Sequence, residues 1–490
     1  MNKIITSQPR FSVRGINVCE SLARHSPEQV ARLIERMASW NMNTLLVHQY
    51  YGYKFHKDLI ESLCRKHGIH IIYMLHTAFA FTPHIPAVFF ALDMDGNPRT
   101  KIACNETKLC VSNPEGLGLF RYGARRYFNS DRAKPESTYL VMDADGYLFC
   151  QCPKCRNIKP VDQWAILLEI AVEEANKAQK NLTIEYLSYV WRYSIPEKIE
   201  LFQHVHGVHF DTHQRFRWRA FNEAHPVNIF SEIEAKVDSR AEGLPINLYL
   251  YERLKEWRQK YTGKLYVFEN LMLQGSISCP QPYTVNLLKD LDLYESLGVD
   301  GVIYEVFEPG IQSFEKQLDL ISESLLKKPQ IPELSALEKI VQHLLLDEQF
   351  NYNPALGYLS LNEADILAAV KADGYDERLI GYLIRLRTFL FDRSYENYCK
   401  VARYVLDHQK RFDWMMILFN LIRIVPKDQL PANLNETTIE FMTVHKLWDM
   451  QEKMQSPSRA FLARSIRRCA ALLTGVGSQN PPPVRGHGSC

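Results

Sequence analysis

Two aspartates and three cysteines lie close together in the segment YLVMDADGYLFCQCPKC, which runs from Tyr139 to Cys155. Asp143 and Asp145 follow an apolar run and are two positions apart, so in an extended strand both side chains point to the same side. When two carboxyl groups lie near each other, one of them acquires a raised pKa that suits general-acid chemistry at neutral pH. Cleavage of a glycosidic bond needs such a pair, an acid for the leaving oxygen and a carboxylate that stabilises charge or orients a nucleophile.

The cysteines Cys150, Cys152 and Cys155 have C-x-C-x-x-C spacing, which admits three interpretations. Three thiolates can bind zinc with a fourth ligand from elsewhere in the chain. The candidates for that fourth ligand are Cys104, Cys110 and Cys279. Cys152 and Cys155 can instead form a redox pair, although no thioredoxin-like context surrounds them. The third interpretation is a cysteine-lined turn that packs against the fold without a metal.

The elements that must position these residues alternate along the chain. Ser26, Pro27 and Gln29 predict a helix start with a capping box, and Gly68 predicts a helix end. Residues 78–135 contain many Pro, Gly and Asn residues, so we expect a long functional loop with short helical pieces. The predicted strands are residues 11–18, 44–50, 69–77, 138–146, 182–189, 205–213, 264–271 and 301–308.

Eight strands with helices between most of them predict a (β/α)8 barrel over residues 10–327. The strand runs are apolar without strict alternation, as in strands that helices cover. From about residue 328 the apolar residues recur only at helical spacing, which predicts an α-helical domain over residues 328–474. Residues 475–490 are rich in Gly, Pro and Ser and predict a disordered tail.

Acidic residues also lie at the predicted ends of other strands, where (β/α)8 barrels form their active sites. Those residues are Asp211, Glu269, Glu305 and Glu308, and Glu185 lies inside the fifth strand. We predict as catalytic candidates Asp143, Asp145 and Glu269, with Asp143 or Glu269 as the acid that protonates the leaving oxygen. We predict that Asp211 and Glu305 contact the substrate.

Aromatic residues and histidines also lie in or near the predicted ends of the strands. The faces of a sugar pack on aromatic rings while its hydroxyl groups form hydrogen bonds, so this combination suits a carbohydrate cleft. The further substrate-binding candidates are Tyr50, Tyr51, Trp191, His76 and His213. Also at this level are Tyr53, Tyr193, Trp218, His48 and His209. The histidines lack the spacing of a metal motif, so we expect them to bind a hydroxyl group or to be satisfied in the core.

Composition limits the classes of partner. The net charge of +2 comes from 58 basic and 56 acidic residues without a long basic run, so nucleic acid and anionic membranes are not expected partners. The sequence shows neither the apolar stretch of a signal peptide nor a run of about 18 apolar residues, so we expect a cytoplasmic protein. Eleven cysteines, an odd number, argue against a disulfide framework. The acids require no cofactor for hydrolysis.

Three segments resemble known carbohydrate-active barrels. RGINVCESLARHSPEQVARLIERMASWNMNTLLVH, from Arg14, resembles the first barrel segment of the group that includes α-glucuronidases and hexosaminidases. YLVMDADGYLFCQCPKC resembles the Asp-Gly then Cys-x-Cys-x-x-Cys signature of a family within that group. Some members of that family are classed as glycoside hydrolase family 163, endo-β-N-acetylglucosaminidases that act on N-glycans. GVDGVIYEVFEPG, ending at Gly310, resembles the eighth-strand segment of the same family.

The resemblance covers about residues 10–310 and implies a retaining glycoside hydrolase in which an N-acetyl group of the substrate acts as nucleophile. By this resemblance Asp145 matches the motif aspartate and Glu305 the acid of strand eight, whereas Asp143 stands where the family is not expected to carry an acid. The chain as given begins directly at the first barrel strand, without the α/β domain that commonly precedes it.

Two other functions remain open at this point. A glycosidase that releases uronic acids would need a basic clamp for the substrate carboxylate. The arginines placed to form such a clamp are Arg192, Arg215, Arg217 and Arg219. A barrel that binds carbohydrate without catalysis is the alternative from another class.

Overall fold

The protein is described from a computed structural model. The structure describes residues 9–331 except 19–21, 23–24, 51, 84, 99–107, 144–148, 203, 213, 216–218, 225–230, 232–233, 271–283 and 306–311, together with 333, 385, 394–408 and 427–429. The chain divides into two compact units, residues 1–339 and 340–490.

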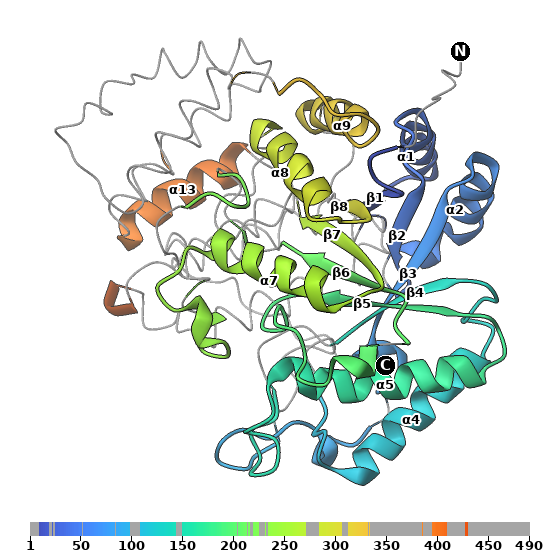
Figure 1. The fold of residues 1–490 in the computed structure, drawn as a ribbon, viewed down its shortest axis with the longest axis vertical. Coiled ribbons are helices and arrows are strands. Elements are labelled where there is room, and N and C mark those ends of the chain that lie inside the picture. The colour runs from blue at the N-terminus through green and yellow to red at the C-terminus, as the bar shows by residue number, and fades with distance from the viewer. Residues whose placement is uncertain are drawn as a thin grey trace, which may run out of the picture. The chain divides into compact units, whose positions relative to one another are not determined.

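Eight parallel strands form a closed barrel in the first unit, in the order β1 to β8 (Figure 1). The prediction of a (β/α)8 barrel is therefore confirmed. The strands are β1 Val13–Asn17, β2 Thr44–His48, β3 His70–His76, β4 Thr138–Met142, β5 Thr183–Ser188, β6 Gly207–Asp211, β7 Lys264–Asn270 and β8 Gly301–Glu305. The register closes the barrel where Asn17 of β1 lies beside Glu305 of β8.

Apolar side chains fill the barrel interior, and they fix which face of each strand points inward. The interior cluster consists of Leu46, Ile72, Met74, Leu140, Met142, Leu187, Phe268 and Ile303. Successive side chains of a strand point to opposite faces, so residues two positions away from these also face inward. By this rule His48 and Glu305 face the barrel interior, one step nearer its carboxyl end than Leu46 and Ile303.

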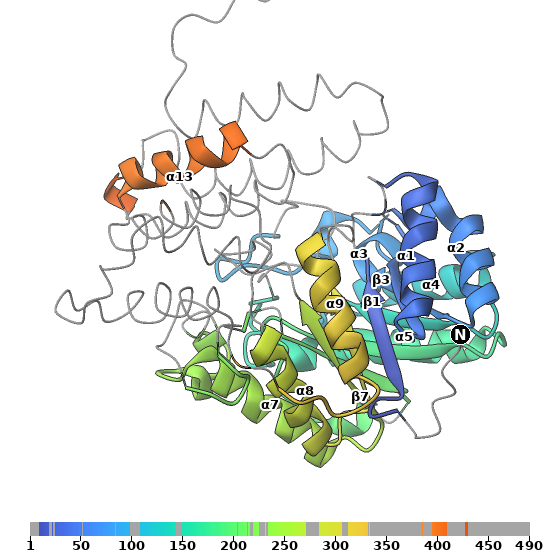
Figure 2. The ribbon, with the colours of Figure 1, turned by 90° about the horizontal axis from the view of Figure 1, so that it is seen from above.

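Helices cover the outside of the barrel. They are α1 Pro27–Ser39, α2 Tyr53–His67, α3 Thr77–Ala80, α4 Pro114–Asn129, α5 Pro160–Lys177, α7 Ile246–Lys260, α8 Thr284–Ser296 and α9 Gln312–Ser324, with 3-10 turns η2 Ala87–Phe89, η4 Ile199–Phe202 and η5 Ser239–Ala241. Figures 1 and 2 show the barrel from two directions, and α1 packs beside α2, α4 beside α5 and α8 beside α9.

Two predicted helix signals are confirmed. The Ser26 side chain accepts the Gln29 backbone N–H, and the Gln29 side chain accepts the Ser26 N–H, which is the predicted capping box of α1. Gly68 ends α2 with a φ of 66°, in the left-handed region that favours glycine. Helix α1 therefore begins, and helix α2 ends, where the sequence predicts.

Helix α4 was not predicted, because its sequence looks like a loop. Gly116, Gly118 and Gly123 all lower helix propensity. The helix nevertheless forms, because Asn113 caps its start by accepting the backbone N–H groups of Glu115 and Gly116 at 3.0 and 3.1 Å. Gly123 has a packing role, since a Cβ atom there would lie 1.9 Å from the Phe81 carbonyl oxygen.

The second unit contains the described helix α13, Tyr395–His408, and the 3-10 turn η8, Lys427–Gln429. The predicted helical domain over residues 328–474 lies largely outside the described residues and stays a prediction. The predicted tail, residues 475–490, lies wholly outside them.

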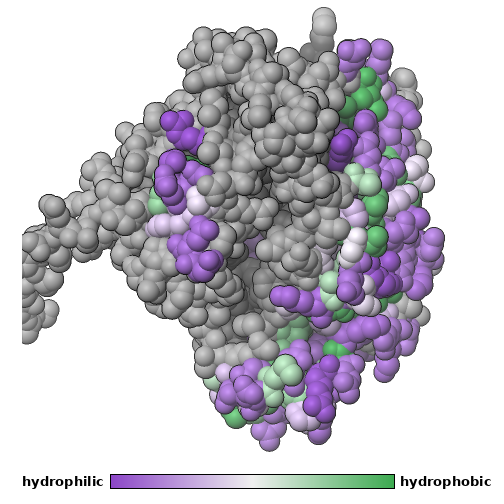
Figure 3. All heavy atoms as spheres, turned by 90° about the vertical axis from the view of Figure 1, so that its left-hand side faces the viewer, coloured by the Kyte–Doolittle hydropathy of each residue, from purple (hydrophilic) through white to green (hydrophobic). Residues whose placement is uncertain are grey.

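Polar and apolar residues are unevenly represented on the surface that Figure 3 shows. On the face that Figure 3 shows, hydrophilic residues predominate among the coloured atoms and apolar ones occur in small groups. The exposed large apolar side chains of the described part are Phe55, Val88, Met94, Leu119, Tyr122 and Leu244. Within the described ranges, no helix is both long enough and apolar enough to span a bilayer.

We predict opposite effects of alanine at two glycines of α4. Gly123→Ala should lower the free energy of unfolding by about 2 kcal/mol, because the new methyl group meets backbone that cannot move aside freely. Gly118→Ala should raise it by about 0.5–1 kcal/mol, because nothing lies within 4 Å of the added atom and alanine favours the helix. Urea unfolding of both variants measures the difference, and equal effects at the two sites would contradict the packing role of Gly123.

Candidate active site

Polar side chains from several strands meet at the carboxyl end of the barrel interior. Asn17, His48, His76, Asp211 and Glu305 each end a strand, and each is at least 94% buried. The Asn17 amide donates to the Glu305 carboxylate at 3.1 Å, which joins the ends of β1 and β8. Three of the predicted substrate-binding residues, His76, Asp211 and Glu305, therefore belong to one rim.

His48 and His76 lie side by side on this rim, with ring centroids 5.5 Å apart. Burial, and then the neighbouring His76, holds the pKa of His48 well below 6.5. His48 is therefore a neutral imidazole at physiological pH, which can donate and accept hydrogen bonds without carrying charge. Such a group suits a sugar hydroxyl better than an anion.

Asp143 lies directly after β4 and is bound by two cations. Its Oδ2 atom accepts from Lys108 Nζ at 2.7 Å and from Arg192 NH1 at 2.8 Å, and all three side chains are buried. A buried carboxylate is costly unless cations and hydrogen bonds compensate the lost hydration. Because these cations fix the carboxylate, Asp143 suits the orientation of a partner better than proton transfer.

Aromatic rings surround these cations. Lys108 Nζ lies 4.0 Å from the centroid of the Phe149 ring, and the Arg192 guanidinium lies 5.6 Å from it and 4.8 Å from the Tyr189 ring. Phe149 in turn stacks on Trp191, with centroids 6.2 Å apart. Cation–π contacts of this kind hold the two basic side chains in place against Asp143. Lys108 was not predicted, because it lies in a loop without a motif; Phe149 was not predicted either, although it directly precedes the cysteine motif.

Trp191, a predicted substrate-binding residue, is held in the left-handed region with a φ of 65°. Its backbone N–H donates to both carboxylate oxygens of Glu234, at 3.0 and 3.2 Å. Glu234 is fully buried, and this burial raises its pKa to about 8. The glutamate therefore holds the turn that carries Trp191 and Arg192. Sequence reasoning missed it because it lies in the connection after β6 and not at a strand end.

Glu269, predicted as a catalytic candidate, has a different place. Phe268 belongs to the interior cluster, so Glu269 faces outward toward α8. It accepts from Arg215 and Thr212 at 2.7 Å each and from the hydroxyl group of Tyr294. The structure thus puts Glu269 in a buried network between barrel and helix, away from the rim.

The same network contains Arg215, one of the arginines of the predicted basic clamp. Arg215 NH2 lies 2.5 Å from Asp290 Oδ2 on α8, while its NH1 contacts Glu269. Arg192 is bound to Asp143. Arg215 and Arg192 are therefore ion-paired within the protein, and Arg217 lies outside the described residues. Arg219 is described, and its backbone oxygen accepts from Arg215 NH2 at 3.3 Å.

Some of the remaining predicted residues lie in the described part of the structure, and others lie outside it. Tyr50 follows β2 and stacks on Phe79 with centroids 5.9 Å apart. Glu185 and His209 form a buried contact of 2.6 Å inside the barrel, two or more positions before the strand ends. The predicted residues Asp145, His213 and Tyr51 lie outside the described residues. That Asp143 and Asp145 share a face therefore stays a prediction.

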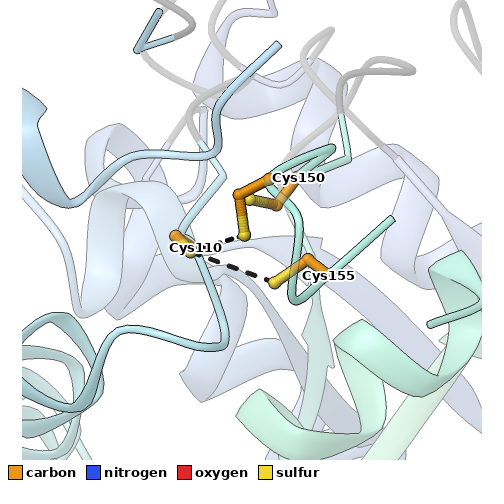
Figure 4. A group of neighbouring side chains, drawn as sticks. Cys110, Cys150 and Cys155 are labelled. Carbon is orange, nitrogen blue, oxygen red and sulfur yellow. Dashed lines mark hydrogen bonds between the residues drawn. The ribbon is translucent and has the colours of Figure 1, made fainter. Parts of the chain in front are cut away.

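Four buried cysteines from the β3–β4 and β4–α5 connections form a cluster, and Figure 4 labels three of them, Cys110, Cys150 and Cys155. Cys150, Cys152 and Cys155 are joined by Cys110, and the four Sγ atoms all lie within 4.8 Å of one another. Hydrogen bonding between the thiols, first of all with Cys150, lowers the pKa of Cys155 to about 5, and the same contact raises the pKa of Cys150. Four thiols at this spacing could hold a metal ion. Of the three candidate partners Cys110 lies here, and Cys104 and Cys279 lie outside the described residues.

No family model and no curated protein matches the sequence. Among solved structures, the chain is similar to a β-galactosidase from the haloarchaeon Halorubrum lacusprofundi, with 11% identity, 66% of this chain and 59% of that chain covered, and a TM-score of 0.43. It is also similar to a β-N-acetylhexosaminidase, with 12% identity, coverage of 71% and 79%, and a TM-score of 0.39.

A third similar structure is a chitobiase from Flavobacterium johnsoniae, with 12% identity, 94% of this chain and 75% of that chain covered, and a TM-score of 0.38. Likeness at this level carries no information about the reaction.

We predict that Glu234→Gln changes how stability depends on pH. Glutamate with an ordinary pKa of 4.5 has a pKa of about 8 at this position, so between these values the folded state keeps a proton that the unfolded chain has lost. The free energy of unfolding of the wild type therefore falls as pH rises through this window. Glutamine does not ionise, so the variant should gain stability relative to the wild type from about pH 5 to about pH 8.

Urea unfolding at several pH values, followed by tryptophan fluorescence, measures this difference. The matched control is Glu242→Gln, a substitution of an exposed glutamate in the same connection. This control shows how much of any change comes from replacing a surface glutamate of this connection. If the difference in the free energy of unfolding between Glu234→Gln and the wild type does not change with pH, Glu234 does not carry a buried, protonated carboxyl group.

Proposed function

We propose that this protein is a glycoside hydrolase whose active site is the rim formed by the carboxyl ends of the strands. The single observation that carries the proposal is the placement of two buried acids, Asp211 and Glu305, at the ends of β6 and β8, on the rim that also carries neutral His48. Acids transfer protons and stabilise positive charge, and a neutral imidazole suits the hydroxyl groups of a sugar.

The finer proposal is a retaining reaction on a glycan that contains N-acetylhexosamine. The carbonyl oxygen of the substrate acetamido group attacks the anomeric carbon, and the bond to the leaving oxygen breaks as that oxygen takes a proton. Water then opens the cyclic intermediate and restores the acetamido group. The sequence resemblance supports this path, with Asp145 as the residue that orients the acetamido group.

The positions of the acids support a division of roles. Lys108 and Arg192 fix Asp143, so we assign to Asp143 the orientation of the substrate and the stabilisation of positive charge. Glu269 faces α8 and does not take part. We assign proton delivery to Asp211 or Glu305, whose side chains face the barrel interior at the strand ends. Under this proposal Trp191 and Tyr50 pack against the sugar.

A uronic acid as substrate is less well supported, because Arg215 binds Glu269 and Asp290 and Arg192 binds Asp143. One observation keeps it as a second candidate: two basic side chains, Lys108 and Arg192, lie together beside Asp143. Glucuronides therefore belong in the substrate panel. A cytoplasmic location stays a prediction, and so does the likeness to glycoside hydrolase family 163.

We predict that the acid role can be identified from the leaving group. The purified protein should release the aryl group from a glycoside of N-acetylglucosamine, and Asp145→Asn should lower kcat/KM by roughly 10²–10⁴-fold whatever the leaving group. The variant that lacks the acid, Asp211→Asn or Glu305→Gln, should lose activity on a poor leaving group. The same variant should regain activity on a dinitrophenyl glycoside, because dinitrophenolate departs without a proton.

Glu200→Gln, at an exposed position in η4, is the matched control and should behave like the wild type in every assay. Leaving-group rescue of Glu269→Gln in place of the two rim variants would contradict the assignment of the acid. Release from glucuronides alone would favour the second candidate. No release from any glycoside, together with no binding of N-acetylglucosamine oligomers, would contradict the proposed hydrolase.

A further inference from the structure

We propose that Cys110, Cys150, Cys152 and Cys155 bind one zinc ion, and that this ion joins two loops so that Lys108 is held against Asp143. The metal is structural and takes no part in bond cleavage. The existence of the metal site does not depend on the proposed hydrolase activity, whereas its effect on turnover rests on that activity.

The spacing of the thiols fits zinc. Tetrahedral zinc with Zn–S bonds of about 2.3 Å separates its sulfur ligands by roughly 3.8 Å. The Sγ atom of Cys110 lies 3.8 Å from that of Cys152 and 3.9 Å from that of Cys155. All four cysteines are buried, and none of them forms a disulfide. Figure 4 shows that Cys110 approaches from a different chain segment than Cys150 and Cys155.

Backbone hydrogen bonds hold the thiols in this arrangement. The N–H groups of Cys155 and Arg156 donate to the Cys152 carbonyl at 2.9 and 3.0 Å, a tight turn that brings two thiols to one side. The Leu92 N–H donates to Cys150 Sγ at 3.4 Å, as a donor toward a thiolate does in outer shells of metal sites.

The Gln163 side chain of α5 anchors the same loop. Its Nε2 atom donates to the carbonyl groups of Cys150, Cys155 and Ile158 at 3.2, 3.1 and 3.0 Å, and its Oε1 atom accepts the Cys150 N–H at 3.2 Å. The ligands are thus set by the protein itself. Four thiolates around Zn²⁺ leave two negative charges, which the exposed Lys154 and Arg156 beside Cys155 partly offset.

The cluster connects the two loops that surround Asp143. Cys110 belongs to the β3–β4 connection, in which Lys108 lies only two residues earlier, and the other three cysteines belong to the β4–α5 connection. Lys108 contacts both Asp143 and the Phe149 ring, and Phe149 directly precedes Cys150. A bond from each loop to one ion would therefore fix Lys108 and Phe149 together beside Asp143. Lys108 acts in this arrangement as a positioning residue.

Metal analysis of the purified protein tests the site. We expect about one zinc ion per chain in the wild type by plasma mass spectrometry, and at least tenfold less in Cys110→Ser. Cys64→Ser is the matched control, because Cys64 is also buried but lies on α2 outside the cluster, and it should keep its zinc. Equal zinc in Cys110→Ser and the wild type would overturn the assignment of Cys110.

A second measurement covers the case in which Cys110→Ser does not fold. After the wild type exchanges its metal for Co²⁺, four thiolates in a tetrahedron should give intense visible absorption bands. Weak bands typical of octahedral cobalt would overturn the site. Iron in place of zinc in the isolated protein would overturn the choice of metal, and a Cys152–Cys155 disulfide in a metal-free protein would show a redox pair instead.

The effect on Asp143 has its own test. Lys108→Met should keep the zinc ion and lower kcat/KM by the same factor as zinc removal from the wild type. Zinc removal without any change of kcat/KM would overturn the positioning of Lys108 by the metal. A zinc-loaded wild type that cleaves no glycoside would contradict the proposed hydrolase and leave the metal site standing.

Discussion

Alternation of side chains within a closed parallel barrel determines which residues of this protein can meet. Each strand has one face toward the interior and one toward the helices, and closure brings the carboxyl ends of all eight strands to one rim. Glu305 follows the interior residue Ile303 by two positions and reaches the rim, whereas Glu269 follows the interior residue Phe268 by one and faces α8. A shift of one position in a strand thus separates a candidate catalytic acid from a structural one.

The second constraint is the cost of burying charge. Asp143 and Glu269 are both at least 95% buried, and each is stabilised by an arginine together with other donors. A buried carboxylate without such partners would cost several kcal/mol. The two networks differ in what surrounds them: Asp143 lies directly after β4 with aromatic rings around its cations, and Glu269 lies between a strand and a helix. Aromatic rings accompany the first network, and helix α8 covers the second.

Much of the barrel could be predicted from the sequence, because its signals are local. The capping box at Ser26 and Gln29 and the terminal glycine at position 68 are read from a few neighbouring residues, and the apolar strand runs set the count of strands. Helix α4 was missed although Asn113 and Pro114 give a local start signal, because its three glycines lower helix propensity. The reason for Gly123, its close approach to the Phe81 carbonyl, becomes visible only in the folded chain.

The candidate site was predictable in part for the same reason. Strand ends identify Asp211, Glu305 and His76, but a strand boundary uncertain by one residue leaves the direction of Glu269 open. Lys108 and Glu234 have no sequence signal, since each acts through a contact distant in sequence, with Asp143 and with the Trp191 backbone. The cysteine spacing indicated three ligands, and the fold was needed to show that Cys110 lies beside them.

The most direct test of the account is to incubate the purified protein with released, fluorescently labelled N-glycans and to follow the products by mass spectrometry. The account predicts a shorter glycan and a complementary fragment that carries the added water, cleaved beside an N-acetylglucosamine residue, with no such product from Asp145→Asn. Intact glycans after prolonged incubation with zinc-loaded wild type, and no measurable binding of them, would contradict the claim that the rim of this barrel cleaves glycosidic bonds.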